Sequence, residues 1–189
     1  KNPVNPMSGR LLIVDAGHSR LKLHAYADGR VRRSVTAARP FDWPASVDVK
    51  IFDECLLMGT HERLLRNVTS YLNQSGGPRP ALLGSDLRVP LESLSGPKGV
   101  GNDRLAQALG AAQKFPGRSC LVVSAGTALV VDILQRDGRF AGGLIAAGWH
   151  ASQKAWTDTA PQLRLDPAEV ISADYPGKST AEALWLGWL

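Results

Sequence analysis

Two segments of the chain share one design, in which a run of apolar residues enters a glycine-containing turn and returns to apolar residues. The first covers residues 11–22 and has Asp15 before its turn; the second covers residues 120–132 and has Ser124 at the corresponding place. A strand–turn–strand unit of this composition gathers backbone N–H groups and a hydroxyl, which suits a phosphate. Its occurrence twice predicts two related halves that face one nucleotide.

The pattern between and after these segments predicts strands alternating with helices. Asp-Gly pairs at residues 28–29 and 137–138 are hairpin signals. Apolar residues at helical spacing cover residues 60–73, 103–115, 149–159 and 180–189. This order predicts a duplicated mixed α/β unit. We expect an amino-terminal lobe over residues 10–98 and a carboxyl-terminal lobe over residues 99–189.

The composition excludes several classes of protein. The net charge of +5 comes from scattered Lys and Arg, with no basic run among aromatics, so nucleic acid is not an expected partner. No apolar stretch approaches the roughly 18 residues of a membrane span. The amino terminus lacks the layout of a signal peptide. Cys55 and Cys120 lie in apolar runs and are expected to be buried free thiols, which predicts a cytoplasmic protein.

The first turn carries residue types that suit a nucleotide phosphate. Asp15 at a strand end can hold Mg²⁺ directly or through water, and Gly17 lets the backbone approach phosphate oxygens. Ser19 offers a hydroxyl and Lys22 a positive charge. A hairpin with Asp15 as its turn residue explains the same segment equally well.

A second candidate group is Gly101-Asn102-Asp103-Arg104, which lies where a helix is expected to begin. Such a helix start exposes N–H donors, and its dipole favours a carboxylate in the first turn. Asp103 suits a general base toward a hydroxyl, and Arg104 suits an anionic substrate group. Taken alone, these residues are explained more simply by a capping aspartate beside a surface arginine.

The second turn, Gly126-Thr127-Ala128, predicts either a second phosphate site or a tight hairpin. The glycines at residues 142–148 either let the backbone approach a ligand or allow close strand–helix packing. The four histidines are dispersed, so no zinc site is expected.

In this order and spacing, the segments resemble the type III pantothenate kinase family, some of whose members are labelled Bvg accessory factor (Baf) homologues. Residues 15–22 look like the family's first phosphate motif, residues 101–104 like its pantothenate motif, and Gly126-Thr127-Ala128 with Asp132 like its second phosphate motif. Residues 138–148 and 177–180 match two further family segments. The resemblance covers residues 11–189.

The resemblance implies a duplicated actin-like (ribonuclease H-like) fold, a homodimer, and ATP-dependent phosphorylation of pantothenate, the first step of coenzyme A synthesis. Asp103 would act as the base on the pantothenate hydroxyl, and Asp15 would bind Mg²⁺. The residues expected to contact the ATP phosphates are Asp15, Gly17, His18, Ser19, Lys22, Gly126 and Thr127. Those expected to contact pantothenate are Gly101, Asn102, Asp103, Arg104 and Thr180.

The chain departs from the family pattern in three places. Ser124 stands where the family has the aspartate that holds a monovalent cation (K⁺ or NH₄⁺), and a neutral hydroxyl is expected to weaken that site. His18 and Ser19 replace asparagine and threonine. The family's final helix–strand segment does not follow Thr180, so we expect a truncated second lobe. These departures leave two alternatives, a catalytically impaired member that binds ligands or regulates, and a Baf-type transcriptional activator.

Overall fold

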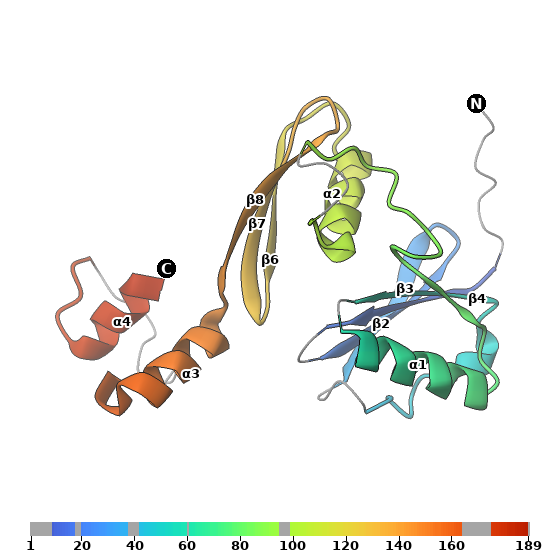
Figure 1. Cartoon of the computed structure of the whole chain (residues 1–189), viewed down its shortest axis with the longest axis horizontal. Coiled ribbons are helices and arrows are strands. Elements are labelled where there is room, and N and C mark those ends of the chain that lie inside the picture. Colours follow the sequence, from blue (N-terminus) through green and yellow to red (C-terminus); the bar gives the residue numbers. More distant parts are fainter. Residues whose placement is uncertain are drawn as a thin grey trace. The chain divides into compact units, whose positions relative to one another are not determined.

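The computed structural model describes residues 9–17, 20–37, 42–59, 61–94, 99–163 and 175–188 (Figure 1). Two of the predicted phosphate residues, His18 and Ser19, lie outside the described residues. The chain forms two compact units. The first unit comprises Lys1–Cys120 with Ile133–Gly142, and the second comprises Leu121–Asp132 with Gly143–Leu189. The predicted lobe boundary between residues 98 and 99 stays a prediction.

The first unit contains a five-stranded mixed sheet in the order β3-β2-β1-β4-β5. Its strands are β1 (Leu11–Ala16), β2 (Leu21–Ala27), β3 (Arg30–Ala37), β4 (Glu54–Gly59) and β5 (Pro80–Leu82). The strands β1, β2 and β3 pair antiparallel, whereas β4 runs parallel to both β1 and β5. A tight turn at Asp28 and Gly29, both with positive φ, joins β2 to β3, as the sequence predicts. The carboxyl ends of β1, β4 and β5 therefore share one edge of the sheet.

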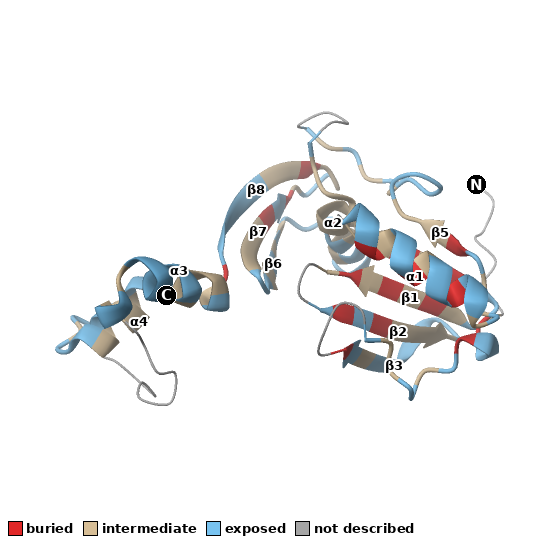
Figure 2. Ribbon diagram, turned by 60° about the horizontal axis from the view of Figure 1, so that its bottom comes forward, coloured by how far each residue is buried: buried red, intermediate tan, exposed pale blue. Residues whose placement is uncertain are grey.

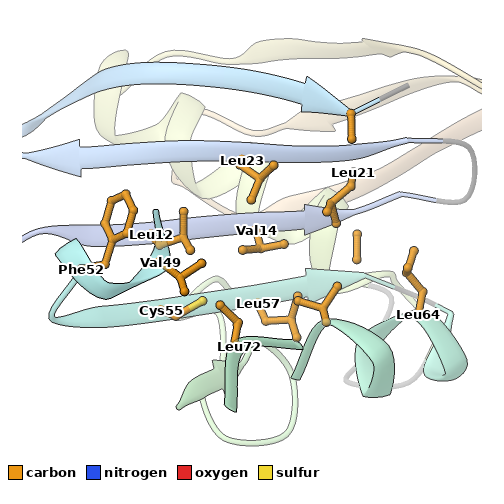
Figure 3. Packing of buried hydrophobic residues seen from close by; sticks show 13 residues of the cluster. Leu12, Val14, Leu21, Leu23, Val49, Phe52, Cys55, Leu57, Leu64 and Leu72 are labelled. Atoms are coloured by element: carbon orange, nitrogen blue, oxygen red, sulfur yellow. The ribbon is translucent and has the colours of Figure 1, made fainter. Parts of the chain in front are cut away.

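One face of this sheet is covered by α1 (Glu62–Gln74). Leu64, Val68 and Leu72 follow each other at the four-residue spacing that forms a single helical stripe, and each is at most 4% exposed. They pack on alternate residues of the strands, which Figure 3 shows from close by. The short 3₁₀ helix η1 (Val49–Ile51) adds Val49 to the same cluster.

The helix α2 (Asn102–Lys114) also belongs to the first unit. Its Ala108 is buried in a small second cluster with Leu134 and Phe140. Leu134 is the last residue of β7 (Ala128–Leu134), and Phe140 is the first residue of β8 (Phe140–Ala147). Leu105 and Val100 pack against this cluster. The helix also contacts β4, so its position is tied to the five-stranded sheet.

A second sheet has three strands in the order β6-β7-β8. These are β6 (Cys120–Ala125), β7 (Ala128–Leu134) and β8 (Phe140–Ala147). Residues 126–127 and 135–139 join them, and Gly138 supplies a positive φ in the second connection. The strand order repeats that of β1-β2-β3, so the predicted duplication and the α/β fold with two sheets flanked by helices are confirmed.

Three helical segments come after the second sheet: α3 (Trp149–Thr159), η2 (Pro161–Leu163) and α4 (Thr180–Trp188). The rings of Trp149 and Trp185 meet edge to face, with centroids 5.1 Å apart, and so join α3 to α4. Figure 2 shows that α3 and α4 carry no buried stripe like that of α1. Within the described residues, no helix has both the length and the apolar character needed to cross a bilayer.

Candidate functional site

The carboxyl edge of the parallel strands gathers the predicted residues of the first unit. In open α/β sheets, ligands bind outside the carboxyl ends of the strands. Asp15 is the last residue but one of β1 and stands beside Lys22 of β2 and Met58 of β4 in the strand register. Its side chain is 25% exposed at this edge, so the carboxylate is accessible to a ligand while the strand beneath it is fixed.

Lys22 lies across from Asp15 and pairs with it. The distance from Lys22 Nζ to Asp15 Oδ2 is 3.4 Å, and the Lys22 side chain is 50% exposed. An ion pair this open to water contributes only about 0–1 kcal/mol to stability. The pair instead affects the charge at the end of β1, where one negative and one positive group lie side by side.

Gly59, at the carboxyl end of β4, is a residue that the sequence analysis missed. A Cβ on Gly59 would lie 2.6 Å from the carbonyl oxygen of Ala16, so a side chain there would push on the strand end that carries Asp15. A Cβ on Gly17 would similarly lie 3.0 Å from the carbonyl oxygen of Arg20. The first turn is thus held by close backbone packing, and a glycine ending an apolar strand was the available signal.

The predicted general base lies in the first turn of α2. Gly101 is the N-cap, and its carbonyl oxygen accepts from the backbone N–H groups of Arg104 and Leu105 at 3.1 and 3.2 Å. A Cβ on Gly101 would overlap Oδ1 of Asp103, so the Asp103 carboxylate is folded back over the cap. The first N–H groups of a helix lack intrahelical acceptors, so this end of α2 is suited to an anion or a polar substrate.

Arg104 faces a different neighbour. Its guanidinium carbon lies 5.5 Å from the centroid of the fully buried Phe140 ring, a cation–π geometry. This contact ties the first turn of α2 to the start of β8. The expected role of Arg104 toward a substrate carboxylate stays a prediction.

Asp15 and Asp103 lie on elements that both contact β4, since β1 pairs with it and α2 packs against it. In the part of the chain that the structure describes, no group of three or more His, Cys, Asp or Glu side chains could hold a metal ion. Mg²⁺ in phosphoryl-transfer enzymes is held by one or two carboxylates together with substrate phosphates. A single accessible Asp15 at a strand end fits that chemistry.

The second unit contains the other predicted phosphate turn. Gly126 donates its N–H to the carbonyl of Ala128 at 2.9 Å, and Gly148 donates to the carbonyl of Thr127 at 2.9 Å. A Cβ on Gly148 would lie 2.8 Å from that Thr127 oxygen. The turn is thus packed against the N-cap of α3, so Gly148 supports close strand–helix packing. Ser124 is half-buried on β6.

Asp132, on β7, is the one charged side chain fully buried among the described residues, at 1% exposure. A Cβ on Gly143 would lie 2.8 Å from its Cα, so β8 approaches β7 closely here. The predicted pantothenate residue Thr180 is exposed at the first position of α4.

Ser179 and Glu182, on either side of Thr180, form a variant of the capping box that the sequence analysis did not identify. The Glu182 N–H donates to Ser179 Oγ at 3.2 Å, and Glu182 Oε2 accepts from the N–H of Lys178 at 2.6 Å. The Ser-x-x-Glu spacing of Ser179 and Glu182 was the sequence signal from which this cap could have been predicted. These residues therefore have a structural role in starting α4, besides the substrate role that the resemblance implies for Thr180.

The structure thus brings Asp15, Gly17, Lys22 and residues 101–104 onto one unit, and Ser124, Gly126, Thr127 and Thr180 onto the other. Cys55 is buried as predicted, whereas Cys120 is only half-buried, so the prediction of two buried thiols is wrong for Cys120. Cys120 is the first residue of β6 and packs against the small cluster of Ala108, Leu134 and Phe140 as a partly buried neighbour.

Comparison with known proteins matches this arrangement to one family. The family model for type III pantothenate kinase matches residues 11–189. A type III pantothenate kinase from Laribacter hongkongensis is 34% identical over 188 residues, which are 95% of this chain and 74% of that protein. One from Burkholderia ambifaria is 32% identical over 177 residues, 86% of this chain and 66% of that protein.

A solved Baf family protein from Campylobacter jejuni has a TM-score of 0.61 at 20% identity, covering 93% of this chain and 72% of that one. At that identity the likeness concerns the fold alone. The chain is accordingly a mixed α/β protein with two sheets flanked by helices. It belongs to the type III pantothenate kinase family.

The chain does not span the full length of its relatives. It covers 74% of the Laribacter protein, 66% of the Burkholderia ambifaria protein and 56% of one from Phenylobacterium zucineum.

Proposed function

We propose that this protein transfers the γ-phosphoryl group of ATP to the primary hydroxyl of pantothenate, giving 4′-phosphopantothenate. The observation that carries the proposal is the carboxyl edge of the first sheet, where the accessible Asp15 and the start of α2 with Asp103 both lie on elements that contact β4. Membership in the type III pantothenate kinase family supplies the substrate class. The reaction would be the first step of coenzyme A synthesis.

Asp103 is proposed to accept the proton of the pantothenate hydroxyl as that oxygen attacks phosphorus. Its carboxylate sits over the cap of α2, where the helix dipole favours a negative charge. The backbone of Gly101 and Asn102 and the guanidinium of Arg104 would hold the rest of the substrate, with Thr180 as a further contact. Transfer of this kind depends mainly on positioning and on charge neutralisation, since its transition state involves little covalent work by the protein.

Asp15 is the residue that would hold Mg²⁺, which would supply charge neutralisation on the ATP phosphates. Lys22 pairs with Asp15 across the strands and is proposed to bind a phosphate as well. Gly17, His18 and Ser19 would complete this phosphate turn. Gly126 and Thr127 are proposed for the second phosphate turn, whose backbone is held by Gly148.

Ser124 is proposed to occupy the position of a weakened monovalent-cation site, with K⁺ or NH₄⁺ as the ion. A hydroxyl offers a partial charge where a carboxylate would offer a full one, so the ion is expected to bind less tightly. A homodimer and a cytoplasmic location are further parts of the proposal.

Ser124 also favours a second candidate, a family member that binds ATP or pantothenate without efficient turnover. ADP release measured with pantothenate, Mg²⁺ and a series of K⁺ concentrations separates the two. Pantothenate-dependent ADP release supports the kinase. Calorimetric binding of pantothenate without ADP release, at every K⁺ concentration, supports the impaired binding protein instead.

A further inference from the structure

A compact turn follows β5 and ties the end of that strand into a closed loop. The backbone N–H groups of Asp86 and Leu87 both donate to the carbonyl of Leu82, at 2.9 and 3.1 Å. The Asp86 side chain accepts from the N–H of Leu82 at 2.9 Å. Gly84 donates its N–H to the carbonyl of Leu87 at 2.6 Å. Four hydrogen bonds over residues 82–87 therefore fix the position of Gly84 relative to the sheet.

The side chain of Asn102 lies directly against Gly84. A Cβ on Gly84 would fall 2.8 Å from Cγ of Asn102 and would overlap its side-chain nitrogen. Gly84 also has φ +104, a conformation that side-chain-bearing residues rarely adopt. The absence of a side chain at Gly84 thus leaves the space that the Asn102 amide fills.

This contact joins the start of α2 to the sheet. Asn102 is the first residue of α2, and Asp103 follows it. Leu83, just before Gly84, donates its N–H to the carbonyl of Leu57 on β4. A continuous path of strand pairing and packing thus runs from β4, which pairs with the strand of Asp15, through Gly84 to the residue next to Asp103.

We propose that the side chain of Asn102 is a positioning residue, which seats on Gly84 and thereby sets where Asp103 stands at the sheet edge. The backbone N–H of Asn102 stays available to a substrate, while its side chain acts through Asp103. This inference rests on the proposed function, because it assigns Asn102 a role in the step that Asp103 performs.

The expected signature is a split between kcat and KM. A misplacement of about 1 Å in a reacting group can cost about 10²-fold in rate. Asn102→Ala is therefore expected to lower kcat roughly 10- to 100-fold while leaving the KM for pantothenate within twofold. Gln107→Ala, an exposed change on the same helix, is the matched control and leaves both constants unchanged.

A second readout does not depend on turnover. Gly84→Ala is expected to lower Tm through its positive φ and through the overlap with Asn102. When Asn102→Ala is also present, the overlap disappears and the cost of the positive φ remains. Gly84→Ala should therefore lower Tm less in the Asn102→Ala background than in the unaltered protein, so the two Tm shifts should be non-additive.

A raised KM for pantothenate with unchanged kcat in Asn102→Ala would make Asn102 a substrate ligand and overturn the proposal. Additive Tm shifts would overturn the Gly84 contact itself. If the unaltered protein releases no ADP with pantothenate, the proposed function fails, and the Tm comparison still decides whether Asn102 seats on Gly84.

Discussion

The two sheets begin with the same arrangement of three strands but are covered very differently. In the first sheet, Leu12, Val14 and Leu57 are fully buried under α1. In the second, Leu121 and Val123 on β6 remain 70% and 61% exposed. Leu144 and Ile145 on β8 are 58% and 60% exposed. A comparable apolar pattern thus gives a closed core in one sheet and leaves apolar side chains of β6 and β8 exposed in the other.

The difference arises from the segments that the chain adds after each set of three strands. After β3 the chain adds two parallel strands and α1, which closes the core over β1, β2 and β4. The same addition creates the carboxyl edge at which Asp15 and the start of α2 gather. Both sheets contain three strands with a glycine turn. The first sheet differs by the segment from β4 to α2, and this segment adds Asp103 to the candidate active site that contains the first glycine turn.

The largest expected contrast in stability is between a buried apolar side chain of the first sheet and an exposed one of the second. Leu57→Ala removes a fully buried side chain of β4 and is expected to cost about 2–5 kcal/mol in the free energy of unfolding. Val123→Ala removes a side chain that is 61% exposed and should change it by roughly 0.5 kcal/mol or less. Urea unfolding followed by circular dichroism measures both; equal losses would show that the second sheet is as well covered as the first.

The two glycine turns are expected to be more alike than the two cores. Gly148→Ala would place a methyl group in overlap with the backbone oxygen of Gly126 and 2.8 Å from that of Thr127, and Gly59→Ala would place one 2.6 Å from that of Ala16. Each is expected to cost about 1–3 kcal/mol, because backbone must move.

Gly110→Ala is the control for these two changes, since nothing lies within 4 Å of a Cβ at that position of α2. It should instead stabilise by roughly 0.5–1 kcal/mol, as glycine is costly within a helix. Thermal unfolding gives the sign of each change. Stabilisation by Gly148→Ala would contradict the backbone packing assigned to the second turn.

The two cysteines provide a comparison that depends on pH. Burial raises the pKa of the Cys55 thiol from 9.0 to about 12. Between pH 9 and 12 the folded protein keeps this proton and the unfolded chain loses it, so the stability present below pH 9 declines as pH rises, by up to about 1.4 kcal/mol per pH unit. Cys55→Ala should flatten this decline in pH-dependent urea unfolding, and an unchanged slope would contradict the burial of the thiol.

Chemical labelling extends the cysteine comparison to the second sheet. Cys120 is half-buried at the start of β6, so a thiol reagent should modify it before Cys55 in the folded protein. Mass spectrometry after brief labelling identifies which cysteine reacted. Faster reaction of Cys55 would contradict the deeper burial of Cys55 relative to Cys120.

A smaller loss of stability is expected at the start of α4. Ser179→Ala removes the acceptor for the Glu182 N–H and should cost about 1 kcal/mol, as is usual for an N-cap. Thr180→Ala changes the exposed neighbouring residue and should cost less. Hydrogen exchange of α4 measures both, and equal protection in the two variants would remove the capping role of Ser179.

The sequence predicts those parts of the molecule that local patterns determine. A continuous apolar run indicates β1, alternating apolar residues indicate β2, and the spacing of Leu64, Val68 and Leu72 indicates α1. Each of these patterns lies within one short segment of the chain. The position of Asp15 at a strand end follows from the same pattern. The Ser179–Glu182 capping box was equally local and was missed.

The remaining features depend on residues that are distant in the chain. The approach of Gly59 to Ala16 and of Asn102 to Gly84 arises only when separate elements pack together. Nothing within residues 80–87 indicates that Gly84 must leave space for a side chain of α2. The exposure of Leu121 and Val123 cannot be predicted from the sequence either, since the apolar run that contains them looks the same as that of a covered strand.

The most direct test of the central claim is pantothenate-dependent ADP release by the unaltered protein and by Asp103→Asn. We expect turnover by the unaltered protein, a fall in kcat of about 10²–10⁴-fold in Asp103→Asn, and retained pantothenate binding with an unchanged Tm. Asp42→Asn, on an exposed loop, should retain full activity. Near-normal turnover by Asp103→Asn would contradict the assignment of the base, and pantothenate binding without turnover in the unaltered protein would contradict the kinase itself.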